Sequence, residues 1–211
     1  MTLGLLLTWL SPAFPIGGFA YSHGLEWAID AGNVTDQATT RDWVGDILAH
    51  GGGRSDAILL RHAHRTRDRD AWRDLSDLAE AAQPSSERRD ETMAQGTAFA
   101  LAGQVWGGGV NGRAAYPVAF GALVGAHGVD EDEAALGYLH AFAANLVSAA
   151  VRLVPLGQTA GLRTIAALAP IVASVAASTR DADLDEIGGA CFRSEIAAMR
   201  HETQYTRLFR S

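Results

Sequence analysis

The feature that most constrains the fold of this chain is the spacing of its apolar residues, which follows a helical period almost everywhere. Apolar side chains recur three and four residues apart, which places them on one face of an α-helix. No stretch alternates β-branched and aromatic residues with a period of two, the pattern of a half-buried strand. The spacing therefore predicts an all-α protein, a bundle of about eight to ten helices.

The length and composition predict one domain with a surface for partners. A chain of 211 residues buries roughly 70% of the surface that its unfolded form exposes, so we expect a single all-helical domain over residues 1–211. Apolar residues make up 48% of the chain, which is ordinary, whereas charged residues make up only 19%. A low charge at ordinary hydrophobicity indicates that another chain covers part of the apolar surface.

The composition also excludes several classes of protein. The one cysteine, Cys191, excludes an intramolecular disulfide framework and a zinc site made of cysteines. The net charge of -7 disfavours binding to nucleic acid, whose phosphates require basic patches. All 17 basic residues are arginine. The chain therefore lacks the lysine that a P-loop phosphate site or a Schiff-base mechanism requires.

Targeting and membrane segments are not expected. The first basic residue is Arg41, and a signal peptide needs basic residues ahead of its apolar run. Residues 134–151 and 164–179 carry no formal charge and approach the length of a membrane span, but they are rich in alanine. Buried helices of a soluble bundle fit these stretches better, so we expect a cytoplasmic protein that does not bind membranes. A membrane-associated helical protein remains a rival, although its helix ends lack basic flanks.

Local signals predict where individual helices begin and end. We expect a helix over residues 19–31 and a break at the three glycines that start at Gly51. Proline or polar residues mark the starts of four other helices: Thr39 or Thr40, Pro117 in a first turn, Asp130 with Glu133, and Asp183 with Glu186 before the last clear helix.

No catalytic, metal or cofactor site emerges from the motifs. His62 and His64 are two residues apart, so on a helix they point in nearly opposite directions and cannot easily share an ion. Ser22 and His23 are adjacent, which does not place a hydroxyl and an imidazole in productive geometry. We expect Cys191 to be a small buried thiol within a helix. The chain is therefore predicted not to be an enzyme, and a helical enzyme with an unrecognised site is kept as the alternative.

Two segments contain more aromatic, arginine and glycine residues than a plain bundle explains. The N-terminal motif, residues 11–27, combines aromatic side chains with glycines that allow close backbone approach. The C-terminal tail, residues 199–211, combines arginines with Tyr205, Leu208 and Phe209. Arginine and aromatic residues together are typical of interface hot spots. The tail is equally consistent with binding a partner and with docking on its own bundle.

The same two segments carry a resemblance to the urease accessory protein F (UreF) family. The family pattern Ser-Pro-x-x-Pro-x-Gly-x-Phe-x-Tyr-Ser-x-Gly-Leu-Glu is matched from Ser11 to Glu26. The segment MRHETQYTRLFRS, residues 199–211, is similar to the family's C-terminal segment nearly throughout. Together with helix order and length, the resemblance extends over essentially the whole chain.

The resemblance implies a non-enzymatic chaperone that works as a homodimer without a cofactor. Members of the family bind urease accessory protein D (also called H) and recruit the GTPase urease accessory protein G, and this assembly delivers nickel to apo-urease. The resemblance implies partner-binding roles for Arg200, His201, Tyr205, Leu208 and Phe209 in the tail, which in the family orders on contact with protein D. It implies a place near the dimer and GTPase-facing surface for Pro15, Gly17, Tyr21, Ser22, Gly24, Glu26 and Arg207.

The sequence leaves the role of Arg207 open between two mechanisms. As part of a scaffold, Arg207 helps to hold the complex together; as an arginine finger, it acts in trans on the nucleotide of the GTPase. We expect Arg207 to act as part of the scaffold.

Overall fold

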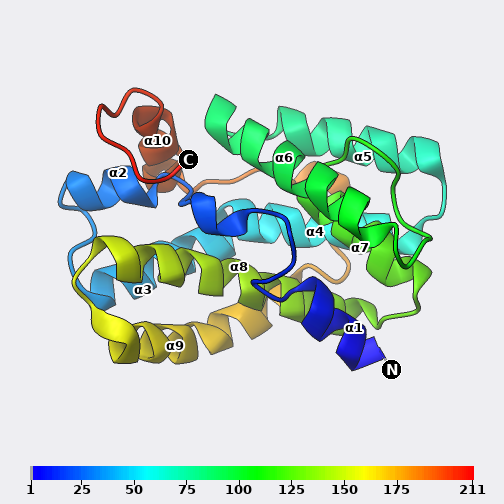
Figure 1. Cartoon of the computed structure of the whole chain (residues 1–211), viewed down its shortest axis with the longest axis horizontal. Helices are drawn as coiled ribbons and strands as arrows, with labels where there is room; N and C mark the ends of the chain where they lie inside the picture. Colours follow the sequence, from blue (N-terminus) through cyan, green and yellow to red (C-terminus); the bar gives the residue numbers. More distant parts are fainter. Residues whose placement is uncertain (1) are drawn as a thin grey trace.

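The computed structural model describes residues 2–211, which form ten α-helices and two 3₁₀ turns and contain no strand (Figure 1). In chain order the elements are α1 (Thr2–Trp9), η1 (Gly18–Ala20), α2 (Leu25–Asp30), α3 (Gln37–His50), α4 (Gly52–Arg65), α5 (Arg69–Ala81), α6 (Ser86–Gly103), α7 (Tyr116–Ala126), α8 (Glu131–Leu153), α9 (Gly157–Ser178), η2 (Leu184–Glu186) and α10 (Phe192–His201). The prediction of an all-α bundle of about eight to ten helices is confirmed.

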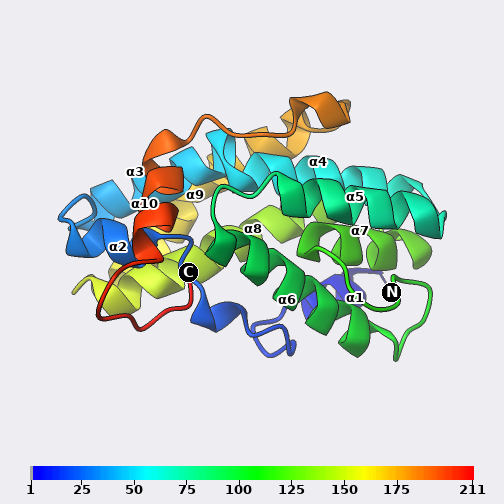
Figure 2. The same cartoon turned by 90° about the horizontal axis from the view of Figure 1, so that it is seen from above.

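Helix α4 lies at the centre of the bundle and packs against α7, α3, α8 and α5 (Figures 1 and 2). Ile58, Leu59 and Leu60 on α4 are all fully buried, as a helix surrounded by others requires. Helix α7 approaches closely because Gly121 and Gly125 face α4, where a Cβ atom would collide with the carbonyl oxygens of Leu60 and His64.

A buried arginine links three helices at one end of the bundle. Arg61 on α4 is 1% exposed, and its guanidinium donates to Glu131 at 2.6 Å and to Asp132 at 2.8 Å, both in the first turn of α8. It also donates to the carbonyl of Ala176 on α9 at 2.7 Å. Because these oxygens replace the water that Arg61 loses, the charge is tolerated inside the protein.

Several predicted helix boundaries are confirmed. Helix α3 ends at His50 and α4 begins at Gly52, so the glycines that start at Gly51 do break the helix. Pro117 lies in the first turn of α7. The Asp130 carboxylate caps α8 by accepting hydrogen bonds from the amides of Asp132 and Glu133 at 3.0 Å.

The predicted cap of α3 was wrong. The capping residue is Asp36, not Thr39 or Thr40, and its carboxylate accepts the Thr39 amide at 2.8 Å. Thr39 is the third residue of the helix, and its hydroxyl closes the capping box from the other side. Asp36 precedes the first apolar residue of the helix by two residues, so the capping signal was present three residues earlier than we placed it.

Two other boundaries also differ from the prediction. The helix expected over residues 19–31 begins only at Leu25, because His23 and Gly24 have positive φ angles. Asp183 and Glu186 cap the short turn η2 rather than the last helix, and α10 begins at Phe192. Cys191 therefore lies at the N-cap of α10 and not within a helix, although it is buried as predicted.

Helices α8 and α9 are long and apolar enough to cross a membrane by length and composition. Half of the most apolar window of α8 and a third of that of α9 are buried within the bundle. These two helices do not demonstrate a membrane location, because core helices of soluble proteins have the same length and composition.

Candidate functional site

The structure brings the N-terminal motif and the C-terminal tail together, although they lie at opposite ends of the sequence. Helix α10 packs across α2, and the tail then runs back along η1 and α2 toward the start of α6 (Figures 1 and 2). The amide of Arg210 donates to the carbonyl of Ala20 at 2.8 Å. The tail therefore docks on its own bundle.

Glu26 is the main anchor of the docked tail. It lies in the first turn of α2 and is only 6% exposed. Its carboxylate accepts the backbone amide of Leu208 at 2.7 Å and that of Phe209 at 2.9 Å. A carboxylate suits this place because it accepts several donors at once and lies at the positive end of a helix dipole.

His201 joins Glu26 to a second carboxylate, which is only partly buried. Its ring is 0% exposed, with Nδ1 at 2.6 Å from Glu87 on α6 and Nε2 at 3.1 Å from Glu26. The other oxygen of Glu87 accepts the Arg207 guanidinium at 2.5 Å. Two carboxylates from α2 and α6 thus hold one imidazole and one guanidinium from the C-terminal segment, which fixes the course of the tail.

Gly24 is required where α2 meets α10. Its φ angle is +74°, and a Cβ atom would collide with the backbone of Ala197 and Ala198. Both the backbone conformation and the close contact exclude a larger residue at this position. Gly17 also has a positive φ of 72°, but it faces open space, so only its conformation constrains the residue type.

Ser22 holds the end of the tail. Its amide and its hydroxyl donate to the main-chain oxygen of Ser211 at 2.8 and 2.5 Å. The Ser22 hydroxyl also accepts the amide of Glu26 at 3.2 Å. A hydroxyl engaged in this way holds the tail in place.

Glu91 on α6 is the second polar centre of the site. It accepts hydrogen bonds from His23 at 2.8 Å, from Gln95 at 2.9 Å and from the Ser211 hydroxyl at 2.6 Å, and it pairs with Arg88. Burial alone would raise the pKa of Glu91, but Arg88 and the donors from His23 and Ser211 outweigh burial and hold this pKa at about 2. The pKa of His23 is lowered by burial and by Arg88.

The outer surface of the site is apolar and basic. Tyr205 is fully exposed and Leu208 is 77% exposed, while Arg200 and Arg207 also reach solvent. Phe192, Ile196 and Met199 extend this surface along one face of α10, four and three residues apart. Large exposed apolar side chains beside arginines are the composition of a protein-binding surface.

The predicted site residues thus divide into two sets. Some are exposed and can touch a partner directly: Pro15, Arg200, Tyr205, Arg207 and Leu208. Others are buried and hold the exposed set in place: Tyr21, Ser22, Gly24, Glu26, His201 and Phe209. Gly17 is half-buried at the start of η1.

The acidic partners on α6 were not predicted from the sequence. Glu87 and Glu91 are four residues apart, and Arg88 and Gln95 place further polar groups on the same turns. Their burial was not evident because α6 begins with a run of charged residues that is typical of a solvated face. The available signal was this spacing of three and four, which aligns acid, base and amide on one face.

A groove of about 1040 Å³ opens between α1, α8 and α9. Its outer walls are apolar and include the exposed side chains of Leu3, Leu7, Phe19 and Leu136. Its floor is polar and includes Asp56, His23, Arg88, Glu91 and Gln95. Tyr138 donates to Asp56 at 2.8 Å, and burial raises the pKa of Asp56 to about 6.

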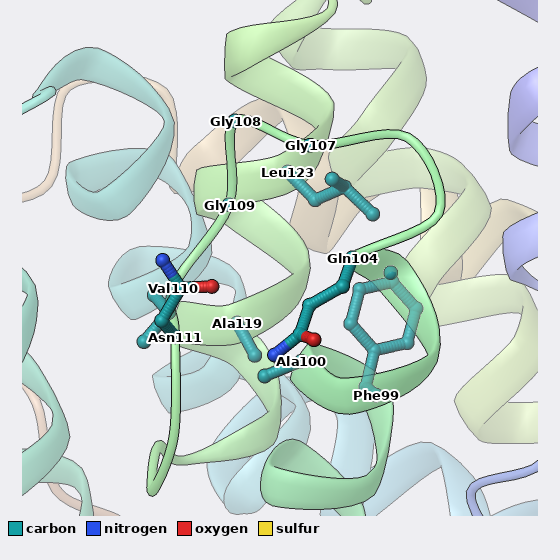
Figure 3. Close-up of a pocket in the computed structure, with 11 residues that line it drawn as sticks. Phe99, Ala100, Gln104, Gly107, Gly108, Gly109, Val110, Asn111, Ala119 and Leu123 are labelled. Atoms are coloured by element: carbon teal, nitrogen blue, oxygen red, sulfur yellow. The ribbon is translucent and has the colours of Figure 1, made fainter.

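A smaller pocket of about 390 Å³ lies under the glycine-rich loop after α6 (Figure 3). Phe99, Leu123 and the backbone of Gly107–Gly109 line it, and its polar side chains are the amides of Gln104 and Asn111. These groups do not titrate, so this pocket has no means of acid–base catalysis.

Within residues 2–211, no three histidine, cysteine, aspartate or glutamate side chains are grouped closely enough to hold a metal ion. Burial raises the pKa of the Cys191 thiol, so less of it is present as the reactive thiolate.

Comparison with known proteins gives one consistent family. The family model described as UreF matches residues 34–169. A "Urease accessory protein UreF" of Cereibacter sphaeroides (strain ATCC 17029 / ATH 2.4.9) is 53% identical over 206 residues, which cover 98% of this chain and 97% of the relative. Proteins of the same name from Rhodopseudomonas palustris (strain BisB18) and Bradyrhizobium sp. (strain BTAi1 / ATCC BAA-1182) are 50% and 49% identical, covering 98% of this chain and 90% of each relative. These names describe accessory proteins and not enzymes, which sets aside the alternative of a helical enzyme.

Proposed function

Since the chain belongs to the UreF family of urease accessory proteins, we propose that it is the scaffold that bridges accessory protein D (H) and the GTPase accessory protein G during nickel insertion into apo-urease. Nickel is the cargo of this assembly, not a cofactor of the chain. We place the protein in the cytoplasm, where the apo-urease that it serves is synthesised.

The observation that carries this proposal is the docking of the tail on the N-terminal motif. Glu26 and His201 are buried and Glu87 is partly buried, and together they fix the backbone, so Tyr205 and Leu208 are presented to solvent in a defined arrangement. A preorganised apolar surface loses less conformational entropy on binding than a free tail does. We assign this surface to protein D.

Arg207 supports the scaffold rather than the arginine finger. Its guanidinium is bound to Glu87 at 2.5 Å, so it is engaged in holding the tail. To reach a nucleotide in trans it would have to leave this carboxylate, which is itself mostly buried and would lose its charged partner. We propose that Arg207 shapes the surface that protein G recognises and that this surface favours one nucleotide state of the GTPase.

The groove between α1, α8 and α9 is the surface that we propose for the homodimer. Its exposed rim is made of apolar and small side chains, with Leu3, Leu7 and Phe19 each more than 60% exposed. The titratable side chains on this rim are Glu133 and His140. Because so few charges lie on it, two copies can meet face to face without like-charge repulsion.

The experiment that tests the scaffold combines the full chain with purified proteins D and G and GTP on a size-exclusion column. We expect a complex that contains all three, and no complex of D with G when the chain is omitted. Replacement of Arg207 by alanine distinguishes the two mechanisms. The scaffold predicts that the complex no longer forms, whereas an arginine finger predicts an intact complex with GTP hydrolysis slower by about 10³-fold or more. Arg73→Ala on α5 is the matched control, because Arg73 is exposed and pairs only with neighbours on its own helix.

A further inference from the structure

The floor of the groove and the docked tail share the same hydrogen-bond network. His23, Arg88, Glu91 and Gln95 all line the groove. Glu91 binds the other three and also accepts the hydroxyl of Ser211 at 2.6 Å. A molecule that covers the groove therefore lies over the buried residues that hold the end of the tail.

Two adjacent residues of the N-terminal motif connect these surfaces. Ser22 binds the main-chain oxygen of Ser211 through its amide and its hydroxyl. The ring of His23 packs edge-on against Phe142 of α8, with ring centroids 4.8 Å apart, and Phe142 lines the groove. A shift of His23 thus moves the residue that holds the tail.

The backbone at His23 makes this connection stiff. Its φ angle of +57° is the one positive value found at a residue other than glycine between residues 2 and 211. A side chain in this conformation is strained, and it persists only where contacts on several sides hold it. Here those contacts are Glu91 on one side and Phe142 on the other.

We propose that occupation of the groove by a second copy of this chain and docking of the tail are coupled through Ser22, His23 and Glu91. A covered groove stabilises the docked tail, and a docked tail tightens the dimer, because coupling between two equilibria is reciprocal. This inference rests on the homodimer proposed above.

The direction of the coupling follows from the access of water to Glu91. When the groove is open, water from the groove can replace the Ser211 hydroxyl, so the tail leaves at low cost. When a second copy covers the groove, Glu91 would lose the Ser211 hydroxyl without a replacement. An unmade hydrogen bond to a buried charge is costly, and undocking is therefore less favourable in the dimer.

The first test uses the unaltered protein. Hydrogen exchange of the Leu208 and Phe209 amides is measured at protein concentrations below and above the dimer dissociation constant. We expect exchange of both amides to slow by about fivefold or more in the dimer, the lower end of ordinary coupling between sites. Exchange rates that do not depend on concentration overturn the coupling.

The second test measures the dimer dissociation constant of Ser211→Ala by sedimentation. This change removes the hydroxyl that binds Glu91 and keeps the main-chain bond to Ser22. We expect the constant to rise by about fivefold or more. Thr203→Ala is the matched control in the same tail, because its hydroxyl binds only the nearby carbonyl of Arg200, and its constant should not change.

The outcomes separate the coupling from the homodimer. A wild-type chain that stays monomeric at every concentration refutes both. A wild-type dimer whose dissociation constant is the same in Ser211→Ala refutes the coupling and leaves the homodimer intact.

Discussion

Replacement of Glu26 by glutamine removes the charge that anchors the tail while keeping the size of the side chain. The carboxylate now accepts the amides of Leu208 and Phe209 and lies 3.1 Å from His201. Glutamine has one acceptor oxygen, so it can keep the hydrogen bond from one of the two backbone amides. Its NH₂ group cannot accept the other amide, and the attraction to His201 is lost.

The magnitude follows from these contacts. Two hydrogen bonds to a carboxylate contribute about 3–6 kcal/mol, and one neutral bond retains about 1 kcal/mol. The docked tail is therefore expected to lose about 2–5 kcal/mol relative to the undocked tail. A loss of 2 kcal/mol corresponds to about a 30-fold change in the docking equilibrium.

Native-state hydrogen exchange at Leu208 and Phe209 is the assay, because both amides are protected only by Glu26 in the docked tail. We expect their exchange to accelerate by about 30-fold or more, with the helical content unchanged. Glu186→Gln, which alters an exposed carboxylate on η2, is the control and should leave both rates unchanged. Rates in Glu26→Gln within about threefold of wild type, a change of less than 1 kcal/mol, would refute the anchoring role.

Three further predictions concern stability measured by urea or thermal unfolding. Gly24→Ala should destabilise the chain by more than 2 kcal/mol, on the order of strain plus a backbone collision, because Cβ would meet the backbone of Ala198 at a φ of +74°. Asp56→Asn should stabilise the chain by about 1–3 kcal/mol at pH 7. Burial raises the pKa of Asp56 to about 6, so its contribution to stability is lost as the pH rises from about 4 to 6. Arg61→Ala should cost more than about 1.5 kcal/mol, because it removes the charged hydrogen bonds that the buried guanidinium donates to Glu131 and Asp132.

Each of these variants has a matched control. Gly32→Ala has the same φ of +74° but faces open space, so it should cost only the strain of about 1–2 kcal/mol. Asp77→Asn alters an exposed carboxylate and should leave the stability at pH 7 within about 0.5 kcal/mol of the wild type. Arg73→Ala removes an exposed arginine and should cost less than about 1 kcal/mol. If a control changes the stability as much as its variant does, the mechanism assigned to that variant is contradicted.

The fold class and most helices were predictable because their signals are local. Apolar periodicity identified the helices, and Pro117 and Asp130 marked two starts that the structure confirms. Asp183 and Glu186 do form a capping box, but it closes a 3₁₀ turn of three residues. Local capping chemistry shows where a turn begins, whereas tertiary packing decides how far the helix continues.

The N-terminal motif shows where local reasoning fails. Its apolar and aromatic residues predicted a continuous helix from residue 19, but the chain turns at His23 and Gly24 before α2 begins. This turn lets Ser22 and Glu26 bind the tail, which lies more than 180 residues away in the sequence. A contact of that separation leaves no periodic signal in either segment.

Composition singled out the two segments of the candidate site and the family resemblance implied its residues, but neither predicted how these residues contact one another. The sequence placed Glu26 and His201 among partner-binding residues, and the structure shows both buried and bound to each other. Whether the tail binds a partner or docks on its own bundle was left open by the sequence. Docking on the bundle and binding to a partner are compatible, because docking buries Phe209 and leaves Leu208 and Tyr205 exposed.

The central claim is that the docked tail presents the surface that binds accessory protein D, and the affinity of D for Leu208→Asp tests it most directly. Leu208 is 77% exposed, so the change should not disturb the fold. Leu101→Asp on α6 is the matched control, because Leu101 is 68% exposed and lies outside the tail. We predict that Leu208→Asp weakens binding by about tenfold or more, equivalent to about 1.4 kcal/mol, while Leu101→Asp binds as the wild type does. Equal affinities of protein D for both variants and the wild type would contradict the account.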